Sequence, residues 1–326
     1  YWLFFLLGIV SLYSGFVLTS AREKTEAAEP ENSVAAGQNT KAKKGKTVGN
    51  QPFYKTKPFL VMCIAFVMIF VSAFSAMCFE TSGFSIKVSD FTLTRDMTHY
   101  YNGGEINGKK FVMENDTSYA VTMYVPESAT EEHPAATVFV LPGFTRTKAT
   151  MSQYCMELSR RGAVVFCMDP GGQGGTTETS TTGANGIEYL VQYVYNNTDD
   201  FKFCDKNRFG AVGHSAGGGN VCTLAADMAG KSYEESIIKA VYISGYIKTS
   251  SANKYKNLNC NAAMSYAYYD EGAFRYQTDT SAFEVISLRF INEVGGKKNN
   301  YDKVAFDYGY GDMADGTYRI VHREKI

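Results

Sequence analysis

The stretch Arg208–Ala229 reads RFGAVGHSAGGGNVCTLAADMA, and its middle decides the fold. The first six residues are typical of a buried strand, whereas the residues from Ala216 onward, rich in Ala and other small side chains, predict a helix. Between them stands the pattern G-H-S-A-G, so a strand is expected to pass directly into a helix through Ser215. Gly213 and Gly217 allow the close backbone approach that so sharp a turn requires.

Strand-type and helix-type segments alternate on both sides of this turn. Short apolar or alternating runs predict strands at Tyr119–Val125, Ala136–Leu141, Ala163–Met168, Lys239–Ser244, Asn261–Tyr266, Val304–Tyr308 and Thr317–Glu324. Helical spacing is found at Thr147–Arg161 and Gly186–Tyr195. This alternation predicts an α/β fold with a mostly parallel sheet flanked by helices. Functional residues of such folds gather at the carboxyl ends of the strands.

Three motifs carry a resemblance to a known family. VFVLPGFTR at 138–146, DPGGQGG at 169–175 and GHSAGG at 213–218 occur in the order and at the spacings of the α/β-hydrolase family, which the chain resembles from about Tyr119 to Ile326. The resemblance implies a hydrolase domain at 85–326, in which 85–118 form an N-terminal β-extension. It also implies that Ser215 attacks an ester, thioester or amide to form an acyl-serine, and that Asp169 is a structural turn residue.

Two backbone N–H groups are expected to form the oxyanion hole of this site. The N–H of Ala216 directly follows the nucleophile and opens the predicted helix, where free N–H groups favour negative charge. The second donor should come from the loop after the strand Ala136–Leu141, where the sequence reads Leu-Pro-Gly-Phe. The N–H of Phe144 is therefore the candidate.

A serine nucleophile also needs a histidine base and a carboxylate that orients it, in the chain order Ser, acid, His. Asp270 follows the predicted strand Asn261–Tyr266 and is the expected acid. Asp312 and Asp315, in the turn GYGDMADG, are the alternatives, and Asp270 as a plain surface carboxylate also stays open.

None of the four histidines fits the position of the base. His99 and His133 precede Ser215, and the His214 side chain is expected to point away from Ser215. His322 lies inside the predicted strand Thr317–Glu324, whereas the base is expected on the loop after the final strand. We therefore expect the base beyond Ile326, in a longer chain of which this is a fragment, with His322 as the alternative.

The N-terminal part predicts one or two transmembrane helices before the hydrolase domain. Residues 1–20 contain an apolar run, Tyr1–Leu18, which is either a transmembrane helix or the remnant of a signal peptide. Phe59–Phe79 is an uncharged run long enough, at about 1.5 Å per residue, to cross a bilayer. Residues 21–58 predict a disordered basic linker. Its lysines favour a cytoplasmic linker, which puts the hydrolase domain on the extracytoplasmic side of the cell membrane.

Composition limits the remaining partners. A formal net charge of −1 gives no concentrated basic face for nucleic acid. No CxxC pattern or Cys/His cluster predicts a metal, no cofactor is expected, and Cys155, Cys167 and Cys222 are expected to be buried thiols. The expected partners are therefore the membrane bilayer and a small-molecule, lipid or peptide ester or amide. Two other functions stay open, a catalytically inactive binding module of the same fold and a subunit of a larger membrane protein.

Overall fold

The chain divides into two compact units, residues 1–81 and 82–326. The computed structural model describes residues 54, 57–81, 85–100, 105–114, 116–178, 183–246, 255–256, 258–270, 282–295 and 297–324. The predicted apolar segment 1–20 and nearly all of the linker at 21–58 lie outside the described residues.

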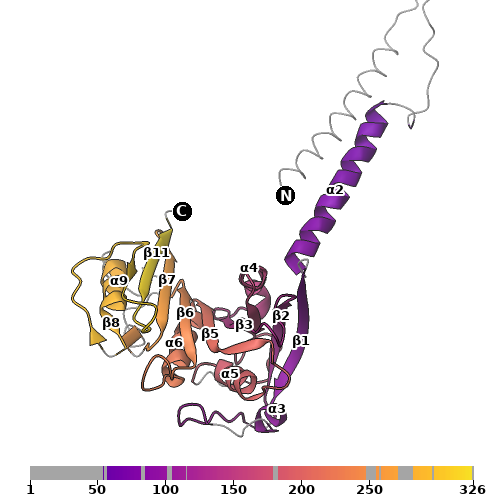
Figure 1. The fold of residues 1–326 in the computed structure, drawn as a ribbon. Coiled ribbons are helices and arrows are strands. Elements are labelled where there is room, and N and C mark those ends of the chain that lie inside the picture. The colour runs from indigo at the N-terminus through magenta and orange to yellow at the C-terminus, as the bar shows by residue number, and fades with distance from the viewer. Residues whose placement is uncertain are drawn as a thin grey trace, which may run out of the picture. The chain divides into compact units, whose positions relative to one another are not determined.

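The first unit contains one long helix, α2 (Lys57–Thr81), drawn in purple in Figure 1. Within the described residues it is the one helix whose length and composition suit a membrane span, with a mean hydropathy of 2.6 over Lys57–Met77. The helix predicted at 59–79 is therefore confirmed. Its insertion into a membrane stays a prediction.

The second unit is built on a nine-stranded sheet in the order β1-β2-β4-β3-β5-β6-β7-β11-β10. The strands are β1 (Ile86–Thr94), β2 (Ser118–Pro126), β3 (Ala135–Leu141), β4 (Val164–Met168), β5 (Cys204–His214), β6 (Ile238–Ser244), β7 (Asn261–Ala267), β10 (Gly309–Tyr310) and β11 (Arg319–Glu324). The six strands from β4 to β11 pair in parallel, and β1, β2 and β10 pair antiparallel with their neighbours. The predicted, mostly parallel α/β sheet is thus confirmed.

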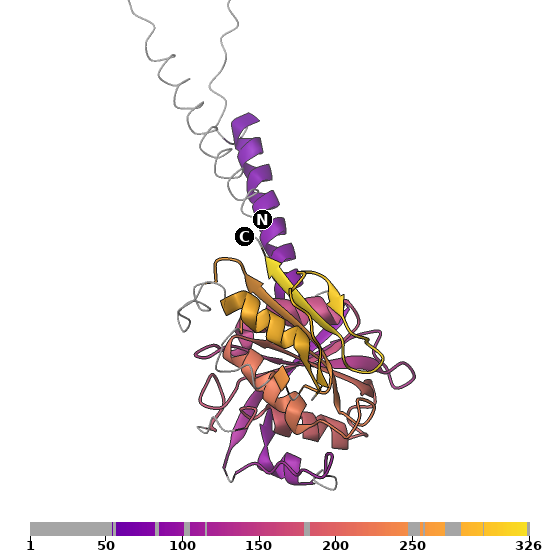
Figure 2. The ribbon, with the colours of Figure 1, turned by 90° about the vertical axis from the view of Figure 1, so that its left-hand side faces the viewer.

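Helices cover both faces of the sheet. These are α3 (Arg95–Tyr100), the 3₁₀ turn η2 (Lys148–Met151) continuing into α4 (Ser152–Arg160), α5 (Ile187–Asn196), α6 (Ala216–Asp227) and α9 (Ala282–Asn292). The side chains of α4 pack with those of β3 and β4 on one face. Those of α5, α6 and α9 join the large core on the other face, and Figure 2 shows α6 and α9 in front of the strands. A separate two-stranded ribbon, β8 (Glu293–Val294) with β9 (Lys297–Lys298), follows α9.

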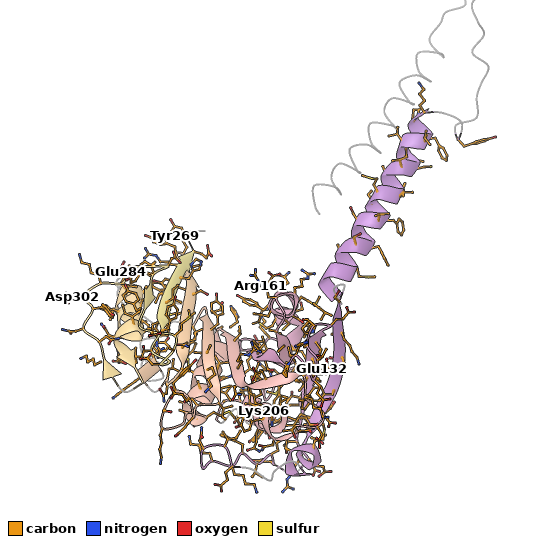
Figure 3. The ribbon with its side chains drawn as sticks, in the orientation of Figure 1. Glu132, Arg161, Lys206, Tyr269, Glu284 and Asp302 are labelled. Carbon is orange, nitrogen blue, oxygen red and sulfur yellow. The ribbon has the colours of Figure 1, made fainter. Side chains whose placement is uncertain are left out.

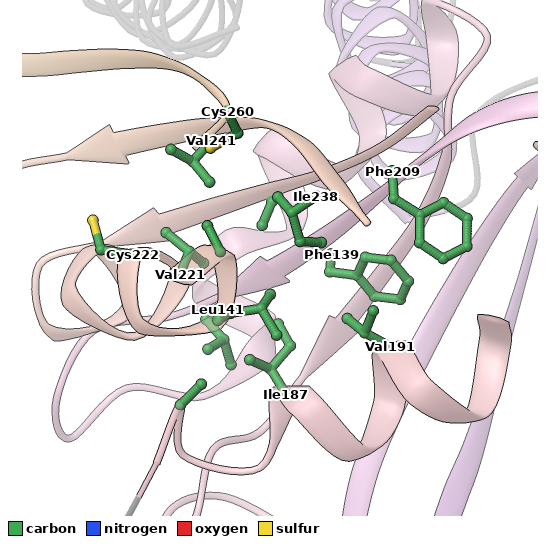
Figure 4. Packing of buried hydrophobic residues seen from close by; sticks show 14 of the residues in the cluster. Phe139, Leu141, Ile187, Val191, Phe209, Val221, Cys222, Ile238, Val241 and Cys260 are labelled. Atoms are coloured by element: carbon green, nitrogen blue, oxygen red, sulfur yellow. The ribbon is translucent and has the colours of Figure 1, made fainter. Parts of the chain in front are cut away.

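The large core explains why the central strands read as continuous apolar runs. Phe139 of β3 stacks on Phe166 of β4 at 5.6 Å between ring centroids, and both side chains are fully buried. Figure 4 shows Phe139 beside Phe209 and Val191, which belong to β5 and α5. Truncating so large a buried ring to Ala costs about 3–5 kcal/mol. The predicted burial of the thiols Cys155, Cys167 and Cys222 is also confirmed, since each has 0% exposure.

Two local predictions were wrong in detail. The strand predicted at Val304–Tyr308 is irregular backbone, and the strand there is the shorter β10. Asp307 has a φ of 62°, which a strand does not accommodate, and its N–H donates to the Val321 carbonyl of β11. The predicted N-terminal β-extension at 85–118 contains β1, but α3 follows it directly.

Candidate active site

The turn between β5 and α6 has the geometry expected around Ser215. β5 ends at His214 and α6 begins at Ala216, so Ser215 alone connects the strand to the helix. Its backbone has φ 51° and ψ −118°, a conformation that costs a residue with a Cβ about 1–3 kcal/mol. The Ser215 N–H donates to the Ser244 carbonyl at 2.7 Å, and the Ser215 carbonyl accepts from the Gly218 N–H at 2.9 Å.

Glycines on both sides of Ser215 permit this turn. A methyl group on Gly213 would lie 2.1 Å from the Gly217 carbonyl oxygen. One on Gly217 would lie 2.5 Å from the carbonyl oxygens of both Leu141 and Pro142. No larger residue fits at either position without moving backbone, and the second contact brings the end of β3 against the start of α6.

The loop after β3 lies beside the Ser215 side chain. A methyl group on Gly143 would be 3.2 Å from the Ser215 Cβ and equally far from the His214 Nδ1. The next residue, Phe144, has an exposed side chain, and its N–H belongs to the backbone that passes Ser215. Both expected oxyanion donors, the N–H groups of Phe144 and Ala216, therefore belong to backbone adjoining Ser215.

The Gln173 side chain holds this loop by two hydrogen bonds, a role that was not predicted from the sequence. Its Nε2 donates to the Gly143 carbonyl at 3.4 Å, and its Oε1 accepts from the Thr145 N–H. Thr145 has a φ of 60°, so this loop, like the turn at Ser215, contains a residue with a Cβ in the left-handed region. Gln173 belongs to the DPGGQGG motif, and this motif was the only feature of the sequence that could have pointed to its role.

Asp169 has the structural role that was predicted. Its carboxylate accepts the N–H of Lys148 at 2.6 Å and the N–H of Gly175 at 2.9 Å, and its own carbonyl accepts from the Thr176 hydroxyl at 2.7 Å. The buried carboxylate thus ties the loop after β4 to the beginning of η2.

Asp270 lies at the same edge of the sheet as Ser215. It follows β7 directly in a turn closed by its own N–H and the Ala267 carbonyl at 3.1 Å. A methyl group on Gly245, the residue after β6, would be 4.0 Å from an Asp270 carboxylate oxygen and 3.5 Å from the His214 Nε2. The side chains of Asp270 and His214 therefore both lie next to Gly245, at the carboxyl end of β6.

The alternative acids lie at the opposite edge. Asp312 and Asp315 are in the turn that precedes β11, whereas Asp270 follows the carboxyl end of the parallel neighbour β7. The Asp312 carboxylate accepts from the Ala314 N–H at 2.9 Å, and the Asp315 carboxylate accepts from the Thr317 hydroxyl at 2.5 Å. Both carboxylates stabilise their own turn.

His322 lies within β11, and both of its ring nitrogens have carboxylate partners. Nδ1 contacts Asp307, and Nε2 is 2.5 Å from the Glu324 carboxylate. Both carboxylates raise the pKa of His322 above its ordinary value, and Glu324 has the larger effect. An imidazole held on both sides in this way is charged over a wider pH range than a free one and offers no free nitrogen to a serine hydroxyl.

Other features of the domain lie away from this edge. Among the described residues, no group of three or more His, Cys, Asp or Glu side chains is arranged to hold a metal ion. A cavity of about 540 Å³ lies at the amino ends of β3, β5 and β6, lined by residues that include Phe209, Tyr233 and Lys239. It is at the edge opposite Ser215.

Comparison with known families agrees with the sheet and the turn. Residues 132–268 match the hydrolase family described as serine aminopeptidase, S33. This segment runs from the loop before β3 to the residue after the end of β7 and includes Ser215 and its flanking glycines. The domain has an α/β-hydrolase fold. The match ends two residues before Asp270 and so does not reach the expected acid.

Solved structures similar to this domain have low sequence identity to it. A hypothetical protein from Pseudomonas aeruginosa is 16% identical, with a TM-score of 0.37, over 52% of this chain and 46% of that one. A putative dipeptidyl aminopeptidase IV from Bacteroides ovatus is 13% identical, with a TM-score of 0.40, over 57% of this chain and 28% of that one. The chain thus spans less than half the length of these two proteins.

A hyperthermophilic esterase from the archaeon Pyrobaculum calidifontis is 16% identical, with a TM-score of 0.41, over 64% of this chain and 74% of that one. No curated protein matches the chain. The identification of the α/β-hydrolase fold therefore rests on the family match and the order of the strands. The reaction, the substrate and the catalytic residues of this chain have to be argued from its own side chains.

Proposed function

We propose that this chain is a membrane-tethered serine hydrolase that cleaves an ester, thioester or amide through an acyl-serine on Ser215. The observation that carries the proposal is the turn at Ser215, where a residue with a Cβ keeps a φ of 51° between a parallel strand and a helix. Strain of this kind at a side chain with nucleophilic chemistry is characteristic of functional sites. Glycine would adopt this backbone conformation without strain, so a serine at this position indicates that its hydroxyl group is used.

The reaction has two steps. The Ser215 Oγ attacks the substrate carbonyl carbon, its proton passes to a base, and the bond from that carbon to the leaving oxygen, sulfur or nitrogen breaks with the proton delivered to the leaving group. Water then attacks the acyl-serine and releases the carboxylic acid. The N–H groups of Ala216 and Phe144 stabilise the oxyanion that forms in each step.

Asp270 is the acid of this proposal. Its carboxylate is at the carboxyl edge of the sheet beside Gly245 and His214, whereas Asp312 and Asp315 are at the amino edge of β11. A carboxylate at the Ser215 edge can hold the tautomer of a histidine and stabilise the imidazolium. Neither alternative acid can reach that edge.

The base of the proposal is a histidine that follows β11. The two carboxylates that contact His322 support this choice, because a base needs a nitrogen with a free lone pair directed at the serine. His214 is not the base of this proposal. It immediately precedes the nucleophile, and its ring lies near Gly245, where a methyl group would be 3.5 Å from the His214 Nε2.

The membrane tether of the proposal is α2. Its 25 residues, at about 1.5 Å each, match the thickness of a bilayer core. Leu60, Ile64, Phe66 and Phe70 are large apolar side chains exposed to solvent on this helix, and only a lipid or protein environment removes them from water.

Labelling with a fluorescent fluorophosphonate tests the proposed nucleophile. We expect labelling of the full chain, extended beyond Ile326 to include a histidine after β11, and loss of labelling in Ser215→Ala. Ser128→Ala, an exposed serine in the loop after β2, is the matched control and should label like the parent. Labelling of the chain that ends at Ile326 would instead make His322 the base.

If neither chain is labelled at Ser215 while both are folded, the hydrolase proposal fails. The fold would then serve as a binding module. That outcome is favoured by the two carboxylate partners of His322, which argue against a complete triad within the described residues.

A further inference from the structure

A row of four polar side chains crosses the sheet at its carboxyl edge and begins beside the proposed nucleophile. The strand register pairs His214 with Ser244, Ser244 with Ser265, and Ser265 with His322. Residues paired directly across parallel strands point to the same face, so these four side chains form one line over β5, β6, β7 and β11. With strands about 4.8 Å apart, the row is about 14 Å long.

Two tyrosines add hydroxyl groups to the row. Tyr154 of α4 brings its hydroxyl to 3.4 Å from the Ser244 Oγ, and the Tyr242 hydroxyl donates to the Ser265 Oγ at 2.7 Å. The two rings lie 6.5 Å apart between centroids. Each hydroxyl can donate one hydrogen bond and accept two, so these contacts leave capacity for a ligand.

The row is continuous with the backbone that holds Ser215. Ser244, whose side chain belongs to the row, also provides the carbonyl that accepts the Ser215 N–H at 2.7 Å. His214, the first member of the row, is bonded directly to Ser215. A substrate whose carbonyl carbon lies at the Ser215 Oγ can therefore extend one of its two ends over these hydroxyl groups.

Among the described helices, α4 reaches this part of the sheet only at its edge, through Tyr154, which contacts Ser244 and packs on Tyr242. On this face α4 packs with β3 and β4, and α6 and α9 pack on the opposite face. The His214 side chain is exposed, Ser244 is half-buried, Ser265 is 8% exposed, and the His322 side chain is 44% exposed. A sheet face that packs against a helix is normally apolar, whereas this one has serine, tyrosine and histidine at its carboxyl end.

The chemistry of the row selects its ligand. Among the described side chains around the row, the three carboxylates of Asp270, Glu324 and Asp307 outnumber the His322 imidazolium that two of them hold, so a phosphate or carboxylate ligand would be repelled. A long acyl chain would cover these hydroxyl groups and satisfy none of the hydrogen-bond capacity that their mutual contacts leave over, which is costly. A neutral ligand with its own hydroxyl groups meets neither penalty.

We propose that this row, Ser244 and Ser265 with Tyr154 and Tyr242, is the subsite for the alcohol part of a sugar or polyol ester. The inference rests on the proposed role of Ser215. The bond that breaks joins the acyl carbon to the ester oxygen of the sugar or polyol. The alcohol leaves with the proton from the base, and the acyl group stays on the Ser215 Oγ until water removes it.

Binding to the full chain with Ser215→Ala tests the subsite without requiring catalysis. The probes are methyl 6-O-acetyl-α-D-glucopyranoside and propyl acetate, which share the acyl group, titrated by saturation-transfer NMR in a detergent without a sugar head group. We expect Ser244→Ala, Ser265→Ala and Tyr154→Phe each to weaken glucoside binding about fivefold, the effect of one lost neutral hydrogen bond. Propyl acetate binding should not change.

Ser89→Ala is the matched control, because Ser89 belongs to β1 at the far side of the sheet. Tyr154→Phe removes one oxygen from a side chain that is 38% exposed, so it tests the row without emptying the core. The proposal is overturned if the glucoside does not bind saturably, or if the three variants bind it like Ser89→Ala. Weakened binding together with absent fluorophosphonate labelling would keep the subsite and reject the hydrolase, and the reverse result would reject the subsite alone.

Discussion

At the scale of single residues, the choice between Asp270 and Asp312 is the most direct test of the proposed triad. In the chain that labels at Ser215, Asp270→Asn should lower the labelling rate about 10³–10⁴-fold, because the base loses the carboxylate that holds its tautomer. Asp312→Asn and Asp315→Asn should change the rate less than twofold, since both carboxylates bind their own turn at the amino edge of β11. The measurement is the second-order rate of fluorophosphonate labelling. Equal effects of the Asp270 and Asp312 substitutions would remove Asp270 from the site.

His322 gives a second residue-scale prediction, on stability against pH. Glu324 and Asp307 raise its folded pKa above the ordinary value, so its stabilising contribution is fully present below the unfolded pKa of about 6.5. That contribution is lost as pH rises through the higher, folded pKa. The temperature at which half of the parent protein is unfolded should therefore decrease as the pH rises from 6 to the folded pKa of His322.

His322→Asn should flatten this part of the stability profile, as followed by thermal unfolding at a series of pH values. His133→Gln is the control, because His133 lies in the loop between β2 and β3, away from β11. A parent profile that stays level from pH 6 to pH 9, or that falls equally in His322→Asn, would show that the two carboxylates do not hold a charged imidazole.

At the scale of elements, the first turn of α5 contains a buried carboxyl group. Glu188 accepts the N–H groups of Ala184 at 3.3 Å and Gly186 at 3.0 Å, and burial raises its pKa to about 7. The ionised form is therefore disfavoured in the folded state. The resulting loss of stability is absent below about pH 4.5, grows as pH rises towards 7 and is constant above that.

Glu188→Gln should consequently raise the free energy of unfolding at pH 8 by on the order of 2 kcal/mol, and should converge with the parent near pH 4. The amide oxygen can still accept one of the two N–H groups, so the start of α5 keeps part of its cap. Urea unfolding at the two pH values measures the difference, with the exposed Glu132→Gln as control. A loss of stability at pH 8 would mean that the second hydrogen bond outweighs the cost of the buried charge.

The elements also show what the sequence could and could not predict. The strands β3 to β7 and the turn at Ser215 were predictable, because burial on both faces and the glycine pattern are local signals. The irregular backbone at Val304–Tyr308 was not predictable, because the left-handed conformation of Asp307 goes with a hydrogen bond to β11, which is distant in the chain.

The row from His214 to His322 is invisible in the sequence for a related reason. It depends on which residues of four strands stand opposite one another, and register is a property of the assembled sheet. The role of Gln173 is equally non-local, because its partners Gly143 and Thr145 are about thirty residues away in the chain. The candidate acid Asp270 was proposed from its position after a strand, and the assembled sheet brings it beside Gly245.

At the scale of the whole molecule, the prediction is that α2 crosses the membrane with the hydrolase domain on the extracytoplasmic side. Lysines at 41, 43, 44 and 46 precede the helix, and Lys/Arg-rich flanks stay in the cytoplasm. A membrane-impermeant maleimide added to intact cells should therefore label Glu132→Cys and leave Lys46→Cys unlabelled until the cells are opened. With Cys63 and Cys78 changed to Ala, background should be low, since the other five cysteines, Cys155, Cys167, Cys204, Cys222 and Cys260, are buried. The reverse pattern would invert the topology, and release of the chain from membranes by alkaline carbonate would reject α2 as a span.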